Sequence, residues 1–428
     1  MKDYKIMGLS LPVYFGLLAV LLGAIALGVL PKGMIGAFLF MMVVGALLDV
    51  IGNNTPIVKT FFGGGPIVII FGSAALVYFN ILPKEITDNV TTFMKGGGFL
   101  DFYIAALITG SILGMSKKLL MKAAIRYFPT ILGGVAVALG LVALGGLIFG
   151  QSPAESIAYI GIPIMGGGMG AGAVPLAEVF GKGLNMPAED ILSRLVPAVA
   201  LGNAIAIVFG GILDRVGKKY PSLTGNGKLM EIGEEDLKVA DKETSLSLKD
   251  FGIGIAVATA FFTFGNIVGD LFVRFLNLDI HPYAWMIISV AIAKSVNLLP
   301  AKLEDACANW YQFVATNWTA ALLMGIGIAY TDLGQVISAF SPVYLVLVFL
   351  VVLGAVLGTA IVGKMVGFYP IEAAITAGLC MANMGGTGDV AVLTAAHRME
   401  LMPFAQISSR LGGAFIILLA TLIVPIFF

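Results

Sequence analysis

Apolar stretches of about 20 residues follow one another along almost the whole chain, and two of them are broken by glycine. Residues 155–181 contain Gly166-Gly167-Gly168-Met169-Gly170, and residues 369–396 contain Gly385-Gly386-Thr387-Gly388. Lipid cannot hydrogen-bond exposed peptide groups, so backbone unwound at membrane depth must lie within protein or along a water-filled cavity. We therefore interpret both segments as re-entrant helical hairpins that line an internal cavity. The competing interpretation is close helix packing through small residues.

Composition excludes a water-soluble protein. Apolar residues make up 59% of the chain and charged residues 12%, against about 45–50% and about 25% in soluble domains. The formal net charge is zero, and no concentrated basic face indicates nucleic acid. The sequence contains no phosphate-binding loop, zinc-protease motif or nucleophile elbow. We expect an all-α integral membrane protein that is driven by an ion gradient and is not an enzyme.

Hydropathy predicts eleven transmembrane helices. They are expected near residues 11–30, 33–52, 64–82, 99–115, 125–150, 189–213, 251–276, 282–299, 310–330, 340–363 and 403–427. With the N-terminus in the cytoplasm, this threading places most Lys and Arg residues inside, as the positive-inside rule requires. The C-terminus is then expected outside.

A polar segment divides the chain into two halves. After an N-terminal segment and first span (1–32), we expect one repeat at 33–213, a cytoplasmic linker at 214–250 and a second repeat at 251–428. Each repeat has five spans and one glycine-broken hairpin, and because five is odd the second copy must be inverted. Inverted repeats are typical of secondary transporters, whose binding site lies where the repeats meet.

A membrane-embedded arginine is expected near the start of the last span. Arg410 follows Gln406, Ser408 and Ser409, and an arginine near the bilayer centre costs about 2.5–3.5 kcal/mol on insertion scales. Its guanidinium offers a two-pronged fork to a carboxylate, so we predict Arg410 as the main substrate ligand. The alternative is an internal ion pair with Asp389, because buried charges are usually paired.

A second arginine holds the corresponding place in the first half. Ser193-Arg194 follows the first glycine cluster much as Ser409-Arg410 follows the second. We predict for Arg194 either a second substrate contact or a pairing at the outer mouth. The acidic candidates for such a pairing are Glu178, Glu189 and Asp190.

The glycine tips suit an anion and a cation at once. Free N–H groups and half-helix N-termini attract a carboxylate, and free carbonyl groups attract Na⁺. We assign the backbone of Gly170 to the substrate and that of Gly168 to sodium. Neutral side-chain oxygens suited to an alkali cation come from Asn383, Thr387, Ser408 and Ser409. For these side chains the competing interpretation is hydrogen bonding between helices.

Three stretches resemble signature sequences of the bacterial 2-hydroxycarboxylate transporters. They are residues 164–176, residues 377–389 and residues 405–413. The resemblance covers essentially the whole chain, including Gly217-Lys218-Lys219-Tyr220 and Tyr330-Thr331-Asp332-Leu333.

This resemblance implies a homodimer in the bacterial inner (cytoplasmic) membrane, with a dimerisation domain and an elevator-like transport domain in each protomer. It implies co-transport of Na⁺ with a small organic anion, citrate, malate or a related 2-hydroxy acid, and no cofactor. It also implies that Arg410 binds a substrate carboxylate, that Asn383 and Ser409 lie near sodium, and that Gly386 and Thr387 form the substrate-facing tip. Asp389 is expected to be structural support.

The chain departs from the citrate carriers of this family at two positions. Met169 and Met384 stand where the resemblance implies a citrate-binding asparagine and a second arginine. Losing a charge-assisted contact gives up about 1.5–3 kcal/mol, so we predict a dicarboxylate such as malate in the substrate site that these residues line. Citrate stays an alternative in which Arg194 supplies the missing charge.

Coupling to Na⁺ is favoured over H⁺ because Asn383 and Ser409 carry no titratable group, although Asp389 is a candidate proton carrier. Two other classes of function stay open on the sequence. One is the membrane subunit of a sodium-pumping decarboxylase, which needs a biotin-carrying partner. The other is a channel, which needs no coupling ion.

Overall fold

The protein is almost entirely helical in the computed structural model, which describes residues 5–61, 64–114, 117–230, 247–276 and 282–427. Within these ranges, extended pairing is confined to a small N-terminal hairpin and one isolated bridge between Met230 and Phe368. The hairpin joins β1 (Lys5–Ile6) and β2 (Leu9–Ser10). The predicted all-α class is confirmed.

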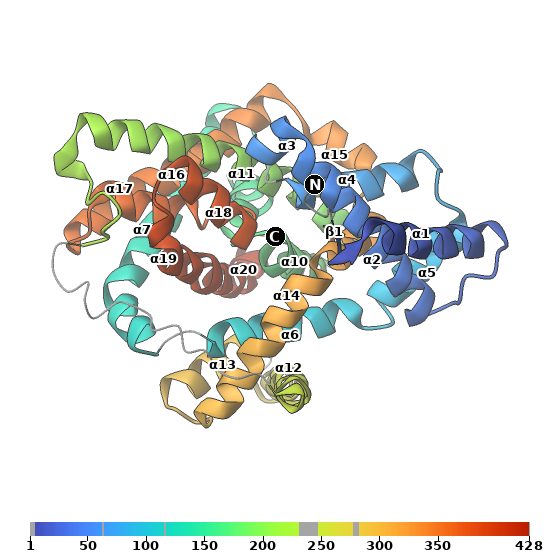
Figure 1. Cartoon of the computed structure of the whole chain (residues 1–428). Helices are drawn as coiled ribbons and strands as arrows, with labels where there is room; N and C mark the ends of the chain where they lie inside the picture. Colours follow the sequence, from blue (N-terminus) through green and yellow to red (C-terminus); the bar gives the residue numbers. More distant parts are fainter. Residues whose placement is uncertain (1–4, 62–63, 115–116, 231–246, 277–281, 428) are drawn as a thin grey trace.

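One group of helices, which we call the scaffold bundle, packs around the long helix α14 (Ala301–Ala329). In Figure 1 this bundle lies to the right and below. Its other members are α1 (Leu11–Ala26), α2 (Met34–Asn54), α4 (Gly65–Tyr78), α5 (Lys84–Met94), α6 (Phe99–Leu113), α12 (Leu248–Leu276) and α13 (Pro282–Ser295). Aromatic rings of α2, α5, α6 and α14 pack edge to face or stacked in its interior, including those of Phe38, Phe93, Phe99 and Trp318.

A second group, the hairpin bundle, is built on two helices in close contact, α7 (Lys117–Ile148) and α16 (Pro342–Met365). It lies to the left in Figure 1. Small residues let the two backbones approach: a Cβ atom added at Gly354 of α16 would lie 2.6 Å from the Cα atom of Ala138 in α7. The bundle also contains α11 (Ala188–Lys219), α19 (Met402–Ile407) and α20 (Gly413–Phe427), with the π-helical turn η7 (Ser408–Gly412) between the last two.

Both glycine-rich segments of this bundle fold as two short helical arms joined at the predicted break. The first comprises α8 (Pro153–Ser156), η1 (Ile157–Gly161), α9 (Ile162–Met165), η2 (Met169–Ala173) and α10 (Val174–Leu184). The second comprises α17 (Pro370–Ala373), η5 (Ala374–Leu379) and α18 (Gly386–Ala395). The chain turns through left-handed backbone at Gly167, Gly168 and Gly385, whose φ angles are 77°, 120° and 79°. Glycine adopts such angles without the strain a side chain would bring.

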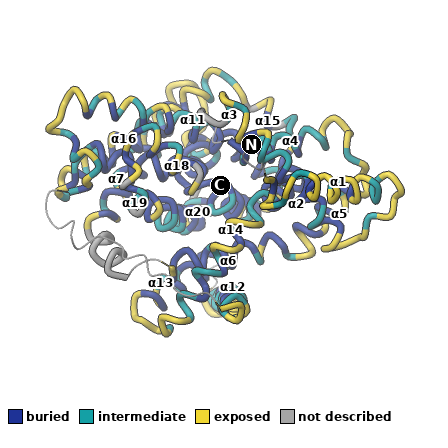
Figure 2. Tube along the Cα trace, viewed as in Figure 1, coloured by how far each residue is buried: buried dark blue, intermediate teal, exposed yellow. Residues whose placement is uncertain are grey.

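Three connections run between the two bundles. One leads from α6 to α7, one from α11 to α12, and one from α14 through α15 (Leu333–Ala339) to α16. The remaining short helices are α3 (Pro56–Phe61), η3 (Pro221–Leu223) and η6 (Met399–Leu401). Figure 2 shows the most buried residues where the bundles meet and within each bundle, with exposed residues around the periphery.

Helix α11 continues to Lys219, past the predicted start of the linker at residue 214, and residues 231–246 of that linker lie outside the described residues. The chain after it docks on the second hairpin: the buried carboxylate of Glu372 accepts hydrogen bonds from the Thr224 hydroxyl (2.6 Å) and the Gly225 N–H (2.9 Å). Arg398, at the far end of the same hairpin, donates to Glu372 at 3.4 Å. The base of the hairpin is thus held by buried hydrogen bonds.

Seven helices in the described ranges are long and apolar enough to cross a bilayer, or eight if α5 and α6, bent by 42°, form one span. The eleven spans expected from the sequence are not all of that length. Apolar stretches of 18–20 residues became helices of only 16 residues in α1 and 14 residues in α4, whereas a perpendicular crossing needs about 20. A multi-pass membrane protein is confirmed, and the count of eleven stays a prediction.

The α7–α16 contact yields a stability prediction. Gly354→Ala should lower the free energy of unfolding by about 1–3 kcal/mol, because the new methyl group overlaps backbone of α7. Gly140→Ala in α7 is the matched control, since a Cβ atom there meets nothing within 4 Å. Thermal unfolding of both variants in detergent measures the difference, and equal midpoints would contradict the described packing.

Candidate functional site

A cavity of about 530 Å³ lies between the two bundles, at the point where the hairpin tips meet. The hairpin bundle lines it with residues 167–171, residues 384–386, Asp389, Gln406, Ser409 and Arg410. The scaffold bundle lines it from five helices: α4 and α13 contribute apolar residues, and the polar groups are Asp49 and Asn53 of α2, Tyr103 and Ser111 of α6, and Tyr311 and Thr319 of α14. The predicted meeting of the two glycine tips at one cavity is therefore present.

The backbones of the two tips approach closely. A Cβ atom added at Gly168 would lie 2.9 Å from the carbonyl oxygen of Met384 and 2.9 Å from the nitrogen of Gly385. The second tip is held in shape by two buried asparagines: Asn383 accepts a hydrogen bond from the Gly385 N–H (2.8 Å), and Asn203 accepts one from the Met384 N–H (3.1 Å). Peptide groups of both breaks thus reach the same space.

Behind the tips, oxygen atoms converge on one hydroxyl group. The Ser409 hydroxyl oxygen lies 2.8 Å from the Cys380 carbonyl oxygen and 2.8 and 2.9 Å from the two carboxylate oxygens of Asp389. Asn383 donates its amide to Asp389 at 2.9 Å. A hydroxyl has one proton to donate, so the Ser409 oxygen cannot satisfy all three acceptors at once. This buried oxygen cluster suits a small cation that accepts several oxygen ligands.

Arg410 faces the cavity from η7. Its guanidinium carbon lies 5.2 Å from the centre of the Tyr311 ring, which belongs to α14 of the other bundle. In the described part of the chain no salt bridge joins Arg410 to Asp389, so the alternative of an internal ion pair is not realised in this arrangement. Arg410 is left with its hydrogen-bonding edge open to a ligand.

The other arginine, Arg194, does not lie where a substrate ligand would. Its side chain is exposed, it does not line the cavity, and its guanidinium carbon lies 5.3 Å from the centre of the Tyr159 ring within the same bundle. Glu189, one of its expected partners, pairs instead with Lys95 at 2.9 Å. The two arginines that match in sequence therefore occupy different environments.

Ser408 is also separated from the cavity. Its hydroxyl donates to the hydroxyl of Tyr127 in α7 at 2.8 Å, which is the helix-to-helix bond of the competing interpretation. Gly168, Gly170 and Gly386 do line the cavity. The side chain of Thr387 lies outside the described residues.

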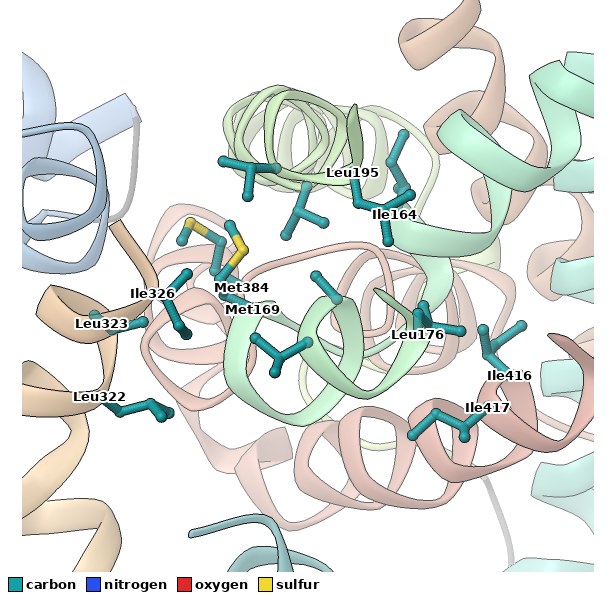
Figure 3. Packing of buried hydrophobic residues seen from close by; sticks show 14 of the residues in the cluster. Ile164, Met169, Leu176, Leu195, Leu322, Leu323, Ile326, Met384, Ile416 and Ile417 are labelled. Atoms are coloured by element: carbon teal, nitrogen blue, oxygen red, sulfur yellow. The ribbon is translucent and has the colours of Figure 1, made fainter. Parts of the chain in front are cut away.

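Met169 and Met384 form an apolar wall. Figure 3 shows the two side chains next to each other, beside Leu322, Leu323 and Ile326 of α14. Both methionines are largely buried, with exposed fractions of 3% and 8%. This side of the cavity offers a ligand no charge.

Sequence reasoning missed several residues of the site. Asp389 was expected as structural support, as a possible ion-pair partner of Arg410 or as a proton carrier, but not as part of the oxygen cluster, in which its carboxylate contacts Ser409 and Asn383. Asn203 and the scaffold residues Asp49 and Tyr311 were not considered. A single polar residue inside an apolar span is a usable signal, and it would have drawn attention to Asn203 and Asp49; the aromatic Tyr311 carries no such signal.

Comparison with known proteins gives a consistent result. The model of the 2-hydroxycarboxylate transporter family matches residues 6–422. The malate transporter MleP of Lactococcus lactis is 39% identical over 432 residues, covering 100% of this chain and 99% of the relative. The citrate/sodium symporter of Salmonella typhimurium and the citrate transporter CitP of Leuconostoc mesenteroides are each 36% identical, covering 98% of this chain and 94% of the relative.

The contact between tips generates a prediction. Gly168→Ala should destabilise the protein by about 1–3 kcal/mol, because the left-handed backbone is strained by a side chain and the methyl group overlaps the second tip. Gly170→Ala is the control: its Cβ atom would meet only the flexible end of Leu322, at 3.3 Å. Unfolding temperatures in detergent distinguish the two, and a control as unstable as Gly168→Ala would refute the tip contact.

Proposed function

Because the chain belongs to the 2-hydroxycarboxylate transporter family, we propose that it is a sodium-coupled symporter of a 2-hydroxy dicarboxylate, most readily malate. Proteins of this family are transporters and not enzymes. One observation carries the proposal: the guanidinium of Arg410, which forms no salt bridge with any residue that the structure describes, faces the same cavity as two glycine tips and a buried oxygen cluster. An anion and a cation are accommodated side by side.

The substrate is bound through one strong ionic contact and several peptide groups. One carboxylate pairs with the fork of Arg410. The second carboxylate and the hydroxyl group of the substrate accept hydrogen bonds from the N–H groups around Gly170 and Gly386. These N–H groups lie at the starts of helical arms, where the helix dipole favours negative charge. The apolar wall of Met169 and Met384 gives a third carboxylate no partner, and burying an unpaired charge is unfavourable. These features favour malate over citrate.

Sodium is proposed to bind at the oxygen cluster. Its ligands are the Ser409 hydroxyl, the Asp389 carboxylate and the Cys380 carbonyl oxygen, with Asn383 holding the carboxylate in place. The carbonyl of Gly168 in the opposite tip is a further candidate. The negative carboxylate offsets the cation, and the bound cation in turn offsets the substrate anion nearby. This mutual dependence couples the two ligands.

The arrangement of bundles supports an elevator mechanism. We propose that the hairpin bundle is the transport domain, that it slides along the scaffold bundle, and that the scaffold forms a homodimer. On the predicted orientation, with the N-terminus cytoplasmic and the C-terminus outside, Asn53 and Ser111 lie toward the cytoplasm, and both line the cavity. At the opposite end Lys95 of the scaffold pairs with Glu189 of the hairpin bundle. On these grounds we propose that this arrangement is the inward-facing one.

The substrate assignment is tested in liposomes. With an inward Na⁺ gradient, the purified protein should accumulate malate faster than citrate, and Met384→Arg should raise citrate uptake relative to malate by supplying a second cation.

Arg410→Lys should reduce malate uptake about 10- to 100-fold, because the variant loses the two-pronged contact and about 1.5–3 kcal/mol of binding free energy. Arg194→Lys is the matched control and should change uptake little. Faster uptake of citrate by the unmodified protein would overturn the assignment.

The cation site is tested by two adjacent serines. Ser409→Ala should raise the Na⁺ concentration for half-maximal malate uptake roughly tenfold, because it removes a ligand and a support of Asp389. Ser408→Ala should have little effect on Na⁺, because that hydroxyl bonds to Tyr127. Uptake driven by a pH gradient without Na⁺ would contradict sodium coupling and favour Asp389 as a proton carrier.

A further inference from the structure

The two sequence-related arginines each rest on a tyrosine ring, but the two rings belong to different parts of the protein. Arg194 and Tyr159 both belong to the hairpin bundle. Arg410 belongs to the hairpin bundle, whereas Tyr311 belongs to the scaffold bundle. A movement of one bundle past the other leaves the first contact intact and breaks the second.

Close packing of α6 against α14 fixes the backbone and Cβ atom of Tyr311, whereas its ring projects into the cavity. A Cβ atom added at Gly110 of α6 would overlap the Cβ atom of Tyr311 and the carbonyl oxygen of Cys307, so α6 and α14 approach closely here. About two turns further along α14, the Thr319 hydroxyl is joined to the Tyr103 hydroxyl at 2.8 Å, which ties the same two helices again. The half-buried ring of Tyr311 projects from this rigid pair into the cavity.

Stacking over a ring leaves a guanidinium able to bind an anion. The ring covers one face of the planar group, while the N–H donors point outward from its edge. The same cavity also contains the carboxylate of Asp389, to which a mobile arginine would be attracted. A ring that holds Arg410 over the cavity keeps its donors available and leaves Asp389 to its own partners.

We infer that Tyr311 is a positioning residue for Arg410 that acts only while the binding site faces the side to which this cavity opens. The inference rests on the proposed function and adds that substrate affinity differs between the two faces of the membrane. In the other state the hairpin bundle has moved and Arg410 lacks this ring. Substrate affinity is therefore set by Tyr311 on one face of the membrane and is independent of it on the other.

Side-specific kinetics test this asymmetry. Malate KM is measured in inside-out vesicles, which present the cytoplasmic face, and in right-side-out vesicles. Tyr311→Leu should raise the cytoplasmic KM about 2- to 30-fold, as expected for loss of a cation–π contact, and leave the outer KM unchanged. Tyr311→Phe keeps the ring and should restore the cytoplasmic KM. Tyr159→Leu, the matched control, should produce no difference between the faces.

Other outcomes overturn the inference. They are an unchanged or lowered cytoplasmic KM, a rise of equal size on both faces, a rise confined to the outer face, and a Tyr311→Phe variant as impaired as Tyr311→Leu, which would assign the effect to the hydroxyl group.

A second measurement separates this inference from the proposed function. Thermal unfolding of Tyr311→Leu, Arg410→Gln and the double variant, in detergent without substrate, reports whether the two side chains interact. Non-additive shifts support the contact, and additive shifts refute it. A protein that transports no 2-hydroxy acid would refute the proposed function, whereas the unfolding cycle would still decide on the contact.

Discussion

Peptide groups released from helices inside a bilayer must find partners within the protein, and the rest of this structure follows from that requirement. Two helical segments are broken at glycine, and each exposes N–H and C=O groups that lipid cannot satisfy. The breaks meet, with Gly168 against the backbone of Met384 and Gly385. Only glycine permits both the left-handed turn and so close an approach. Asn383 and Asn203 satisfy the N–H groups of Gly385 and Met384, so the backbone of both breaks is held at one internal position.

A cavity forms at that position because the scaffold bundle faces the tips without filling the space between them. The hairpin bundle supplies the groups that are suited to binding, and the scaffold supplies a wall. The two parts are joined by three chain connections, by apolar packing such as that of Met169 and Met384 beside α14, and by polar contacts such as Lys95–Glu189. This boundary is the plane of the proposed movement. Contacts that cross it, including that of Arg410 with Tyr311, depend on the position of the bundles.

Few charged side chains line the cavity. Arg410 supplies a positive group for the anion, and Asp389 supplies a negative group for the cation, while Met169 and Met384 form an uncharged part of the wall. Arg410 and Asp389 offset each other when the site is empty, Asp49 adds a second carboxylate on the scaffold side, and the charge of a bound dianion is offset by the sodium ions proposed to bind with it. Such balance lowers the penalty of moving a charged ligand through a low-dielectric environment.

The sequence by itself determined the membrane setting, the helical class, the two glycine breaks and the position of Arg410 near them. These are local properties. The length of an apolar segment, the conformational freedom of glycine and the cost of one charge in lipid each depend only on residues that are close together in the sequence. Residue type left both Ser408 and Ser409 as cation ligands, and tertiary structure decided that Ser408 bonds to Tyr127 while Ser409 enters the oxygen cluster, and that Tyr311 lies under Arg410. Neighbours on a helix point about 100° apart, and the direction of each is fixed only when distant helices pack, so no local pattern contains it.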